Sequence, residues 1–154
     1  CSGTTVDGGA LDTTVAGGMV FSVTATDNAG NSTSATVNYS VGYGVVALFD
    51  QTKAHNSGSA VPIKIRLVDA NGVNVSSAAT AVHAVSVVQV SSQASTNVED
   101  AGNANPDLDF RYDANLAGYV FNLKTTGFGT GSYVLKFVVG TDTAQYSVGF
   151  QVRQ

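Results

Sequence analysis

Several residue types are scarce in this sequence, and each shortage excludes a class of structure. Tryptophan is absent, cysteine and methionine each occur once, and proline occurs twice in 154 residues. Glu99 is the only glutamate, and leucine and lysine are sparse, so most strong helix formers are missing. Valine, threonine, serine, alanine, glycine and asparagine are abundant instead, and the β-branched and turn-forming residues among them are typical of β-strands separated by turns. We therefore expect an all-β protein.

Charge is scarce as well, and its distribution excludes two classes of partner. Charged residues make up 12% of the chain, and the formal net charge is −4. The seven lysines and arginines are scattered singly between positions 53 and 153, so no basic patch for nucleic acid is expected. No apolar run approaches the ~18 residues of a membrane-spanning helix. We expect neither nucleic acid binding nor membrane insertion.

Residues 17–41 are predicted to form a β-hairpin. Apolar and polar side chains alternate with a period of two on both sides of residues 27–31, Asp-Asn-Ala-Gly-Asn, which have the chemistry of a turn. Two strands alone are marginal in water, so this hairpin needs partners from residues 1–16, from the following module or from another chain. The apolar positions are Met19, Phe21, Val23, Ala25, Ala35, Val37, Tyr39 and Val41.

A short junction is predicted at residues 42–44, and a β-sandwich module at residues 45–154. Pro62 lacks an N–H group, so its strand is expected to begin there or to lie at a sheet edge. The polar segment 92–106 is predicted to be an exposed loop. Several short alternating segments broken by turns are typical of an antiparallel sandwich. The predicted strands cover residues 45–50, 60–69, 81–91, 119–124, 133–139 and 146–153.

Cys1 is the single cysteine, so it forms no disulfide within these 154 residues. Three interpretations are open at this point. Cys1 is an unpaired thiol, the lipid-modified N-terminus of a lipoprotein, or one half of a disulfide whose partner lies upstream.

The first 41 residues carry a specific sequence pattern. It consists of residues 1–4 (Cys-Ser-Gly-Thr), 11–14 (Leu-Asp-Thr-Thr), 21–31 (Phe-Ser-Val-Thr-Ala-Thr-Asp-Asn-Ala-Gly-Asn) and 37–41 (Val-Asn-Tyr-Ser-Val). This pattern resembles the C-terminal half of bacterial immunoglobulin-like repeats of the HYR-like kind. The resemblance implies that about half of the repeat is missing, including an upstream cysteine that would pair with Cys1.

Residues 45–154 resemble a second family, the C-terminal module of bacterial extracellular proteins that is named for a P-x-K-F motif. Residues 62–65 (Pro-Ile-Lys-Ile) depart from that motif by Ile for Phe, and residues 110–113, 118–121 and 131–133 fit its later strands. Together the two resemblances imply antiparallel Ig-like β-sandwich modules in tandem, the first one incomplete. They also imply an extracellular or cell-surface location.

Calcium is the one metal that the sequence brings into consideration. Oxygen-bearing side chains gather in the turn at 27–31 and again between residues 99 and 113, where Asn103 and Asn105 accompany several carboxylates. Ca²⁺ takes six to eight oxygen ligands, and neither segment has the spacing of an EF-hand loop. A hydrogen-bonded turn and a solvated acidic loop are therefore the favoured interpretations. No other cofactor is expected, and the candidate calcium ligands are Asp100, Asp107 and Asp109.

No catalytic constellation is recognisable. His55 and His83 provide too few ligands for zinc, and His83 is expected to be a strand residue with a satisfied ring nitrogen. The serines occur without the G-x-S-x-G pattern of a nucleophile elbow. Lys64, Lys124 and Lys136 are expected on the solvent face of their strands rather than in isopeptide crosslinks.

These observations predict a non-catalytic structural or adhesive module of a secreted or cell-surface bacterial protein. Its partners would be an upstream segment of the same protein, or neighbouring subunits that pair with its strands and assemble into fibres. The alternative is a carbohydrate-binding accessory module of a secreted enzyme. In that case polysaccharide would stack on the aromatics expected in loops, Tyr43, Tyr112 and Phe128.

Overall fold

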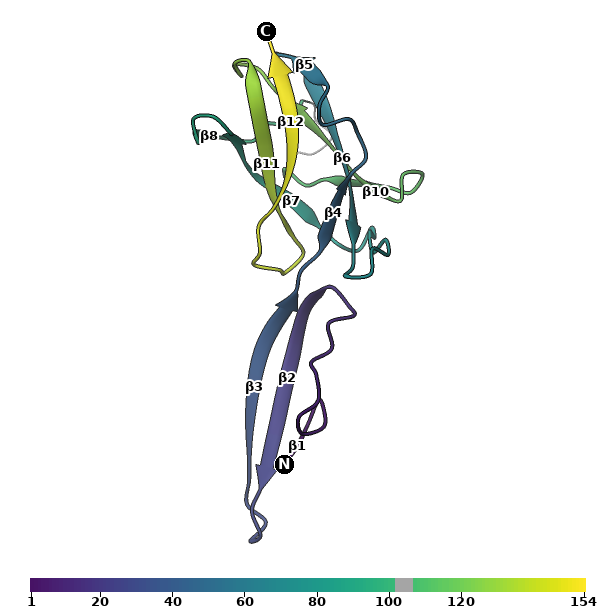
Figure 1. The fold of residues 1–154 in the computed structure, drawn as a ribbon, viewed down its shortest axis with the longest axis vertical. Helices are drawn as coiled ribbons and strands as arrows, with labels where there is room; N and C mark the ends of the chain where they lie inside the picture. The colour runs from purple at the N-terminus through teal and green to yellow at the C-terminus, as the bar shows by residue number, and fades with distance from the viewer. Residues whose placement is uncertain (102–106) are drawn as a thin grey trace.

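The computed structural model describes residues 1–101 and 107–154, and this part of the chain is all-β. Figure 1 shows an elongated molecule with a small N-terminal sheet at one end and two further sheets at the other. The part that the structure describes holds no helix long and apolar enough to span a membrane. The predicted fold class is therefore confirmed at the level of an all-β chain with antiparallel sheets.

The N-terminal sheet has three antiparallel strands in the order β1-β2-β3. Its two long strands form the predicted hairpin, and the short β1 pairs with the outer side of β2. The strands are β1 (Ser2–Gly3), β2 (Gly17–Thr26) and β3 (Ser32–Val41).

Two sheets form the remaining part of the molecule. The first has the order β4-β6-β10-β9 and the second the order β5-β12-β11-β7-β8. All pairs are antiparallel except β5 with β12, which is parallel. The strands are β4 (Gly44–Ala47), β5 (Ala54–Asn56), β6 (Ala60–Val68), β7 (Val82–Gln89), β8 (Ser95–Thr96), β9 (Arg111–Asp113), β10 (Gly118–Lys124), β11 (Gly131–Val139) and β12 (Tyr146–Arg153).

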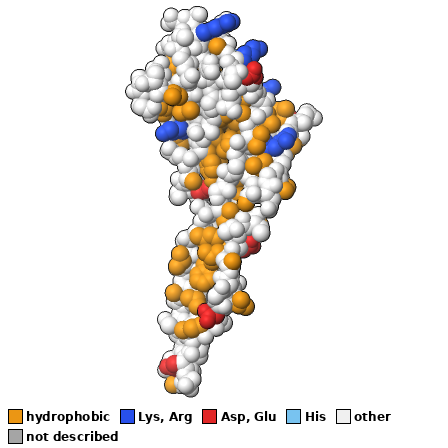
Figure 2. Space-filling view, in the orientation of Figure 1, with side chains coloured by type: hydrophobic (Ala, Val, Ile, Leu, Met, Phe, Trp, Pro, Cys, Tyr) orange, Lys and Arg blue, Asp and Glu red, His pale blue; other side chains and the backbone are white. Residues whose placement is uncertain are grey.

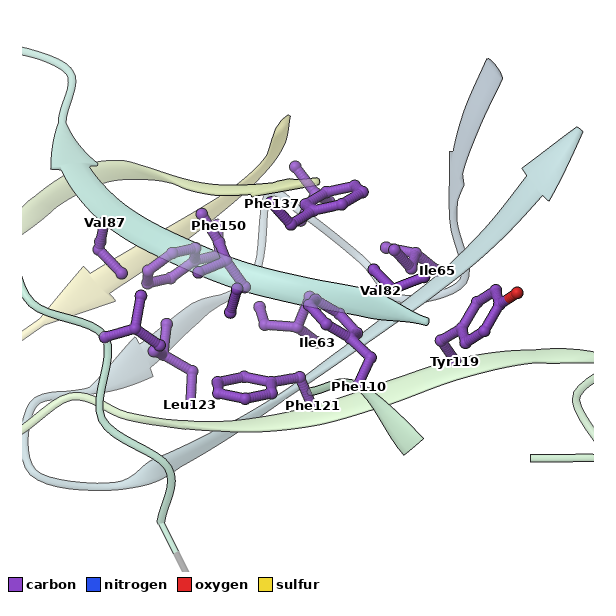
Figure 3. Packing of buried hydrophobic residues seen from close by; sticks show 14 of the residues in the cluster. Ile63, Ile65, Val82, Val87, Phe110, Tyr119, Phe121, Leu123, Phe137 and Phe150 are labelled. Carbon is purple, nitrogen blue, oxygen red and sulfur yellow. The ribbon is translucent and has the colours of Figure 1, made fainter. Parts of the chain in front are cut away.

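One hydrophobic core lies between these two sheets, which we call the sandwich (Figure 3). Alternate side chains of β6, β10, β11 and β12 point into it, as the period of two predicts. Phe110 links the two sheets, because its ring lies 5.1 Å from Phe121 of β10 and 5.5 Å from Phe137 of β11. Burying each such side chain contributes roughly 1.5–3 kcal/mol, so this core is the main source of stability in the sandwich.

Of the two alternatives predicted for Pro62, a strand start is wrong, and a position at the edge is confirmed locally. β6 begins two residues earlier, at Ala60, and lies between β4 and β10. β4 pairs only with residues 65–68 of β6. Leu48 donates its backbone N–H to the carbonyl of Lys64, so the backbone groups of Lys64 face the β4 side of β6. Pro62 lies two residues away, and its backbone groups therefore face the same side. The missing N–H of Pro62 therefore points past the end of β4, where no ladder bond is lost.

The polar segment 92–106 is only partly a loop. β8 pairs with β7, and the backbone of residues 99–101 bonds to β10 through Lys124 and Asn122. Val98 is buried in the core. A single inward apolar residue within a polar run gives no periodic signal, so the sequence could not distinguish this short pairing from an exposed loop.

Two hairpin turns use the same local chemistry. The carboxylate of Asp27 accepts the backbone N–H groups of Ala29 and Asn31, and Asp69 does the same for Asn71 and Val73. In each turn the fourth residue is a glycine with positive φ, 87° at position 30 and 77° at position 72. This confirms the predicted turn at 27–31. Hydrogen bonds from the surrounding N–H groups hold the pKa of the Asp27 carboxyl below its usual value.

Candidate functional site

The N-terminal sheet has one apolar face, which lacks the cover that the sandwich core has. The β2–β3 register places Met19 opposite Tyr39 and Phe21 opposite Val37, so all these side chains lie on the same face. None of residues 1–41 is fully buried, and the side chain of Val37 is 60% exposed. Figure 2 shows hydrophobic side chains along the narrow part of the molecule. The apolar face comprises Met19, Phe21, Val23, Ala25, Ala35, Val37, Tyr39 and Val41.

The segment between β1 and β2 covers part of this apolar face. The Tyr39 hydroxyl donates to the backbone carbonyl of Asp12 at 3.0 Å. A shallow hollow of about 340 Å³ remains beside Phe21 and Val23, bordered by Val6 and Leu11 of the same segment. Val6 is 81% exposed, whereas Phe21 and Val23 are half-buried, so the segment covers the face only in part.

The opposite face of the N-terminal sheet is a ladder of hydroxyl groups. The hydroxyl groups of Thr24 and Ser34 lie 2.8 Å apart, and those of Thr26 and Ser32 also lie 2.8 Å apart. Such cross-strand Ser and Thr pairs stabilise neighbouring strands by a few tenths of a kcal/mol up to about 1 kcal/mol. This face is built for solvent, and the register of the hairpin is fixed by both faces together.

The outer edge of β3 carries backbone groups that no strand of residues 1–101 or 107–154 pairs with. Asp27 donates its N–H to the carbonyl of Asn31, so odd-numbered residues of β3 bond to β2. The even-numbered residues therefore direct their N–H and C=O groups outward. β2 follows the same rule, because the carbonyl of Ser22 accepts the N–H of Thr4 on the β1 side.

A chain of hydrogen bonds joins the N-terminal sheet to the sandwich. The backbone N–H of Tyr43 donates to the hydroxyl of Tyr146, and that hydroxyl donates to the Asp142 carboxylate at 2.5 Å. Ser40 of β3 also hydrogen-bonds to the Asp142 side chain. The Tyr43 ring meets the Tyr146 ring edge-on, with centroids 6.0 Å apart. We call Ser40, Tyr43, Asp142 and Tyr146 the junction network.

Burial and hydrogen bonding act in opposite directions on Asp142. Its side chain is buried, and desolvation alone would raise the pKa of the carboxyl. Hydrogen bonds from Tyr146, from the Ala144 backbone and from Ser40 outweigh desolvation, so the pKa lies below its usual value. Burial and the nearby Asp142 carboxylate raise the pKa of Tyr146. Asp142 is thus an anion and Tyr146 a neutral donor at neutral pH.

The structure does not bring the three candidate calcium ligands together. The backbone of Asp100 pairs with Leu123 in β10, whereas Asp109 lies beside β7 and its carboxylate contacts His83 Nδ1 at 2.7 Å. Within residues 1–101 and 107–154, no three His, Cys, Asp or Glu side chains are grouped closely enough to hold a metal. Asn103 and Asn105 lie outside the described residues. A chain without a cofactor therefore remains the prediction, with calcium in this segment as the alternative.

The other candidate residues lie apart from one another. His83 is a strand residue with a satisfied ring nitrogen, as expected. Lys124 lies near the surface and pairs with Glu99 at 2.9 Å. Cys1 is an exposed free thiol next to β1, and its pairing with an upstream cysteine remains a prediction.

The three aromatics considered for sugar binding do not form an open platform. Tyr43 contacts Tyr146, Tyr112 contacts Tyr119, and the Phe128 ring stacks on Tyr133 at 4.9 Å. All three also pack against the sandwich core. Their rings serve the packing of the sandwich and its junction.

Comparison with known proteins adds no relative. No model of a protein family matches the chain, and no curated protein matches it. The two family resemblances therefore remain expectations, and the candidate site is defined by the geometry of the N-terminal sheet.

Sequence reasoning found the apolar face and missed the junction network. Tyr43 and Tyr146 are 103 positions apart in the chain, and no local pattern links them. Asp142 had one signal that could have been used, since it lies two residues after Gly140, between two predicted strands, and four residues before Tyr146. Such a turn carboxylate is positioned to accept nearby backbone N–H groups.

Proposed function

We propose that this chain is a non-catalytic structural module, in which the N-terminal sheet is one half of an Ig-like unit that added strands complete. The observation that carries the proposal is the contrast between the two ends of the molecule. The sandwich has a closed core, whereas the apolar face of the N-terminal sheet is half-buried at most and the outer edge of β3 pairs with no strand of the described residues. Exposed edges and apolar faces of this kind are sites of strand addition and of interaction.

The low charge and the many serine and threonine residues suit a spacer in an extracellular or cell-surface protein. The junction network supports the same role, because it ties the N-terminal sheet to the sandwich and limits their relative motion. The proposed module would hold its neighbours at a defined orientation. The packing of Tyr43, Tyr112 and Phe128 against other rings of the sandwich gives no support to polysaccharide binding.

Calorimetric unfolding of the whole chain tests this proposal against a truncated chain of residues 44–154. We expect two transitions for the whole chain, because the N-terminal sheet lacks a core and unfolds at a lower temperature than the sandwich. The truncated chain should retain the upper transition, shifted by only a few degrees. The proposal would be contradicted if the whole chain unfolded in a single cooperative transition and the truncated chain showed no transition at all. The N-terminal sheet and the sandwich would then form one complete fold.

A further inference from the structure

We infer that the outer edge of β3 pairs with β3 of a second copy of this chain, antiparallel and centred on Thr36. This inference rests on the proposed function, since it names the strand that completes the N-terminal sheet. We call this edge, with the outward backbone groups of Ser32, Ser34, Thr36, Asn38 and Ser40, the β3 edge.

The β3 edge carries none of the features that protect natural edge strands from pairing. It is ten residues long, and residues 32–41 contain no lysine, no other charged residue and no proline. No bulge interrupts its register with β2. Natural proteins block edges with such features because an unpaired row of N–H and C=O groups recruits another strand. Their absence over the whole strand indicates an edge that pairs.

The pattern of side chains makes the strand complementary to itself. In antiparallel pairing centred on Thr36, two residues lie opposite each other when their numbers add to 72. Even-numbered residues therefore face even-numbered residues, and odd-numbered residues face odd-numbered residues. Ala35 then faces Val37 of the other copy on the apolar face, and Ser34 faces Asn38 on the polar face. The outward even-numbered residues provide the hydrogen-bonded pairs of the ladder. No like charges meet, because the strand has no charges.

The β2–β3 pair shows that this type of pairing suits the strand. Its hydroxyl groups already pair across strands at 2.8 Å, in Thr24–Ser34 and Thr26–Ser32. A second copy would extend both the hydroxyl ladder and the apolar face into a sheet with β2-β3-β3-β2 at its centre. Because the pairing is antiparallel and β3 leads directly into the sandwich, the two sandwiches would lie at opposite ends (Figure 1).

The size of the contact sets the expected strength. A ten-residue strand spans roughly 33 Å, and one strand-to-strand contact falls at the small end of specific interfaces. We therefore expect a reversible dimer that forms at concentrations of roughly 10 µM to 1 mM.

The experiment is sedimentation equilibrium of the whole chain under reducing conditions, so that the exposed Cys1 thiol forms no disulfide. Thr36→Lys and Thr36→Glu each place like charges face to face at the centre of the pairing, so each variant alone should be monomeric. An equimolar mixture of the two should regain dimers, because Lys then faces Glu. Thr24→Lys is the matched control, on the same face but one strand inside the edge, and should dimerise like the unmodified chain.

A second readout locates the contact. Raising the protein concentration should slow hydrogen exchange at the outward amides of Ser34, Thr36 and Asn38 in the unmodified chain and not in Thr36→Lys. A chain that stays monomeric at 1 mM overturns the inference, as do dimers that persist in both Thr36 variants. A monomer that still unfolds in two transitions leaves the proposed function standing. A monomer with one cooperative transition overturns both.

Discussion

Asp142 is a buried carboxylate in the turn between β11 and β12, and its partners come from both parts of the molecule. It accepts hydrogen bonds from Tyr146 and Ala144 of the sandwich and from Ser40 of the N-terminal sheet. Its role is to fix Tyr146, whose hydroxyl in turn accepts the backbone N–H of Tyr43. One ionised side chain therefore orders the hydrogen bonds of the junction.

The charge of Asp142 is expected to make the stability of the folded chain depend on pH. The pKa of Asp142 is lower in the folded chain than its unfolded value of about 3.9. Its ionised form therefore stabilises the folded state above that value, and this contribution is lost as the pH falls through the folded pKa. Asp142→Asn should lower the free energy of unfolding at pH 7 by about 1–3 kcal/mol, because partners of the carboxylate lose an acceptor.

Urea unfolding of both proteins between pH 7 and pH 2 measures this effect. The difference in unfolding free energy should be largest above about pH 5 and should shrink as Asp142 becomes protonated. Asp12, Asp27 and Asp50 also have lowered pKa values in the folded chain, and they cancel in the comparison because both proteins contain them. A difference that stays constant over this range would show that the charge of Asp142 plays no part.

At the level of strands and turns, the same turn chemistry occurs in the N-terminal sheet and in the sandwich. Gly30 and Gly72 have the same place in their turns and similar positive φ values, 87° and 77°. A Cβ at either position would meet no atom within 4 Å, so substitution strains only the backbone. The two glycines therefore form a matched pair that reports on the N-terminal sheet and on the sandwich separately.

Replacing each glycine by alanine should cost about 1–2 kcal/mol, since an L-residue at positive φ crowds its own carbonyl. Gly30→Ala should lower only the first thermal transition, and Gly72→Ala should lower only the second. Calorimetry of the two single variants and the double variant checks this, and the double variant should show both shifts. If each substitution moved both transitions equally, the sheet and the sandwich would unfold as one unit.

Strands with a clear period of two were predictable from sequence, and short or non-local pairings were not. Leu135 and Phe137 of β11 lie on either side of Lys136, and their neighbours along the strand are less buried than they are, so their inward direction followed from the sequence. β5 is only three residues long and pairs in parallel with β12, nearly 100 positions away. Val98 lies in the core although its neighbours are polar. In both cases tertiary pairing decides the structure, and no local pattern records it.

In the candidate site too, some features were predictable from the sequence and others were not. Residues 17–41 showed their apolar face through alternation alone, and the need for further partners followed from the small size of the hairpin. Only the structure shows that β1 and the segment before β2 cover this face loosely. Only the structure shows the junction network as well, because its hydrogen bonds join residues that are far apart in the chain.

In the whole molecule, a sandwich with one core carries a three-stranded sheet whose apolar face is only partly covered. The sandwich buries residues from both of its sheets in that core. The N-terminal sheet has its register, its turn and its junction in place, and within the described residues no second sheet pairs with it. We expect such an element to have a low local free energy of opening and to gain stability when strands are added.

Native-state hydrogen exchange of the dilute monomer tests this claim most directly, because it reports the free energy of opening at each amide. The amides that bond β2 to β3 should exchange about a hundredfold or more faster than the core amides of β6, β10 and β11, since few buried contacts hold the N-terminal sheet. Equal protection in the N-terminal sheet and the sandwich would contradict the account, because the sheet would then be complete without added strands.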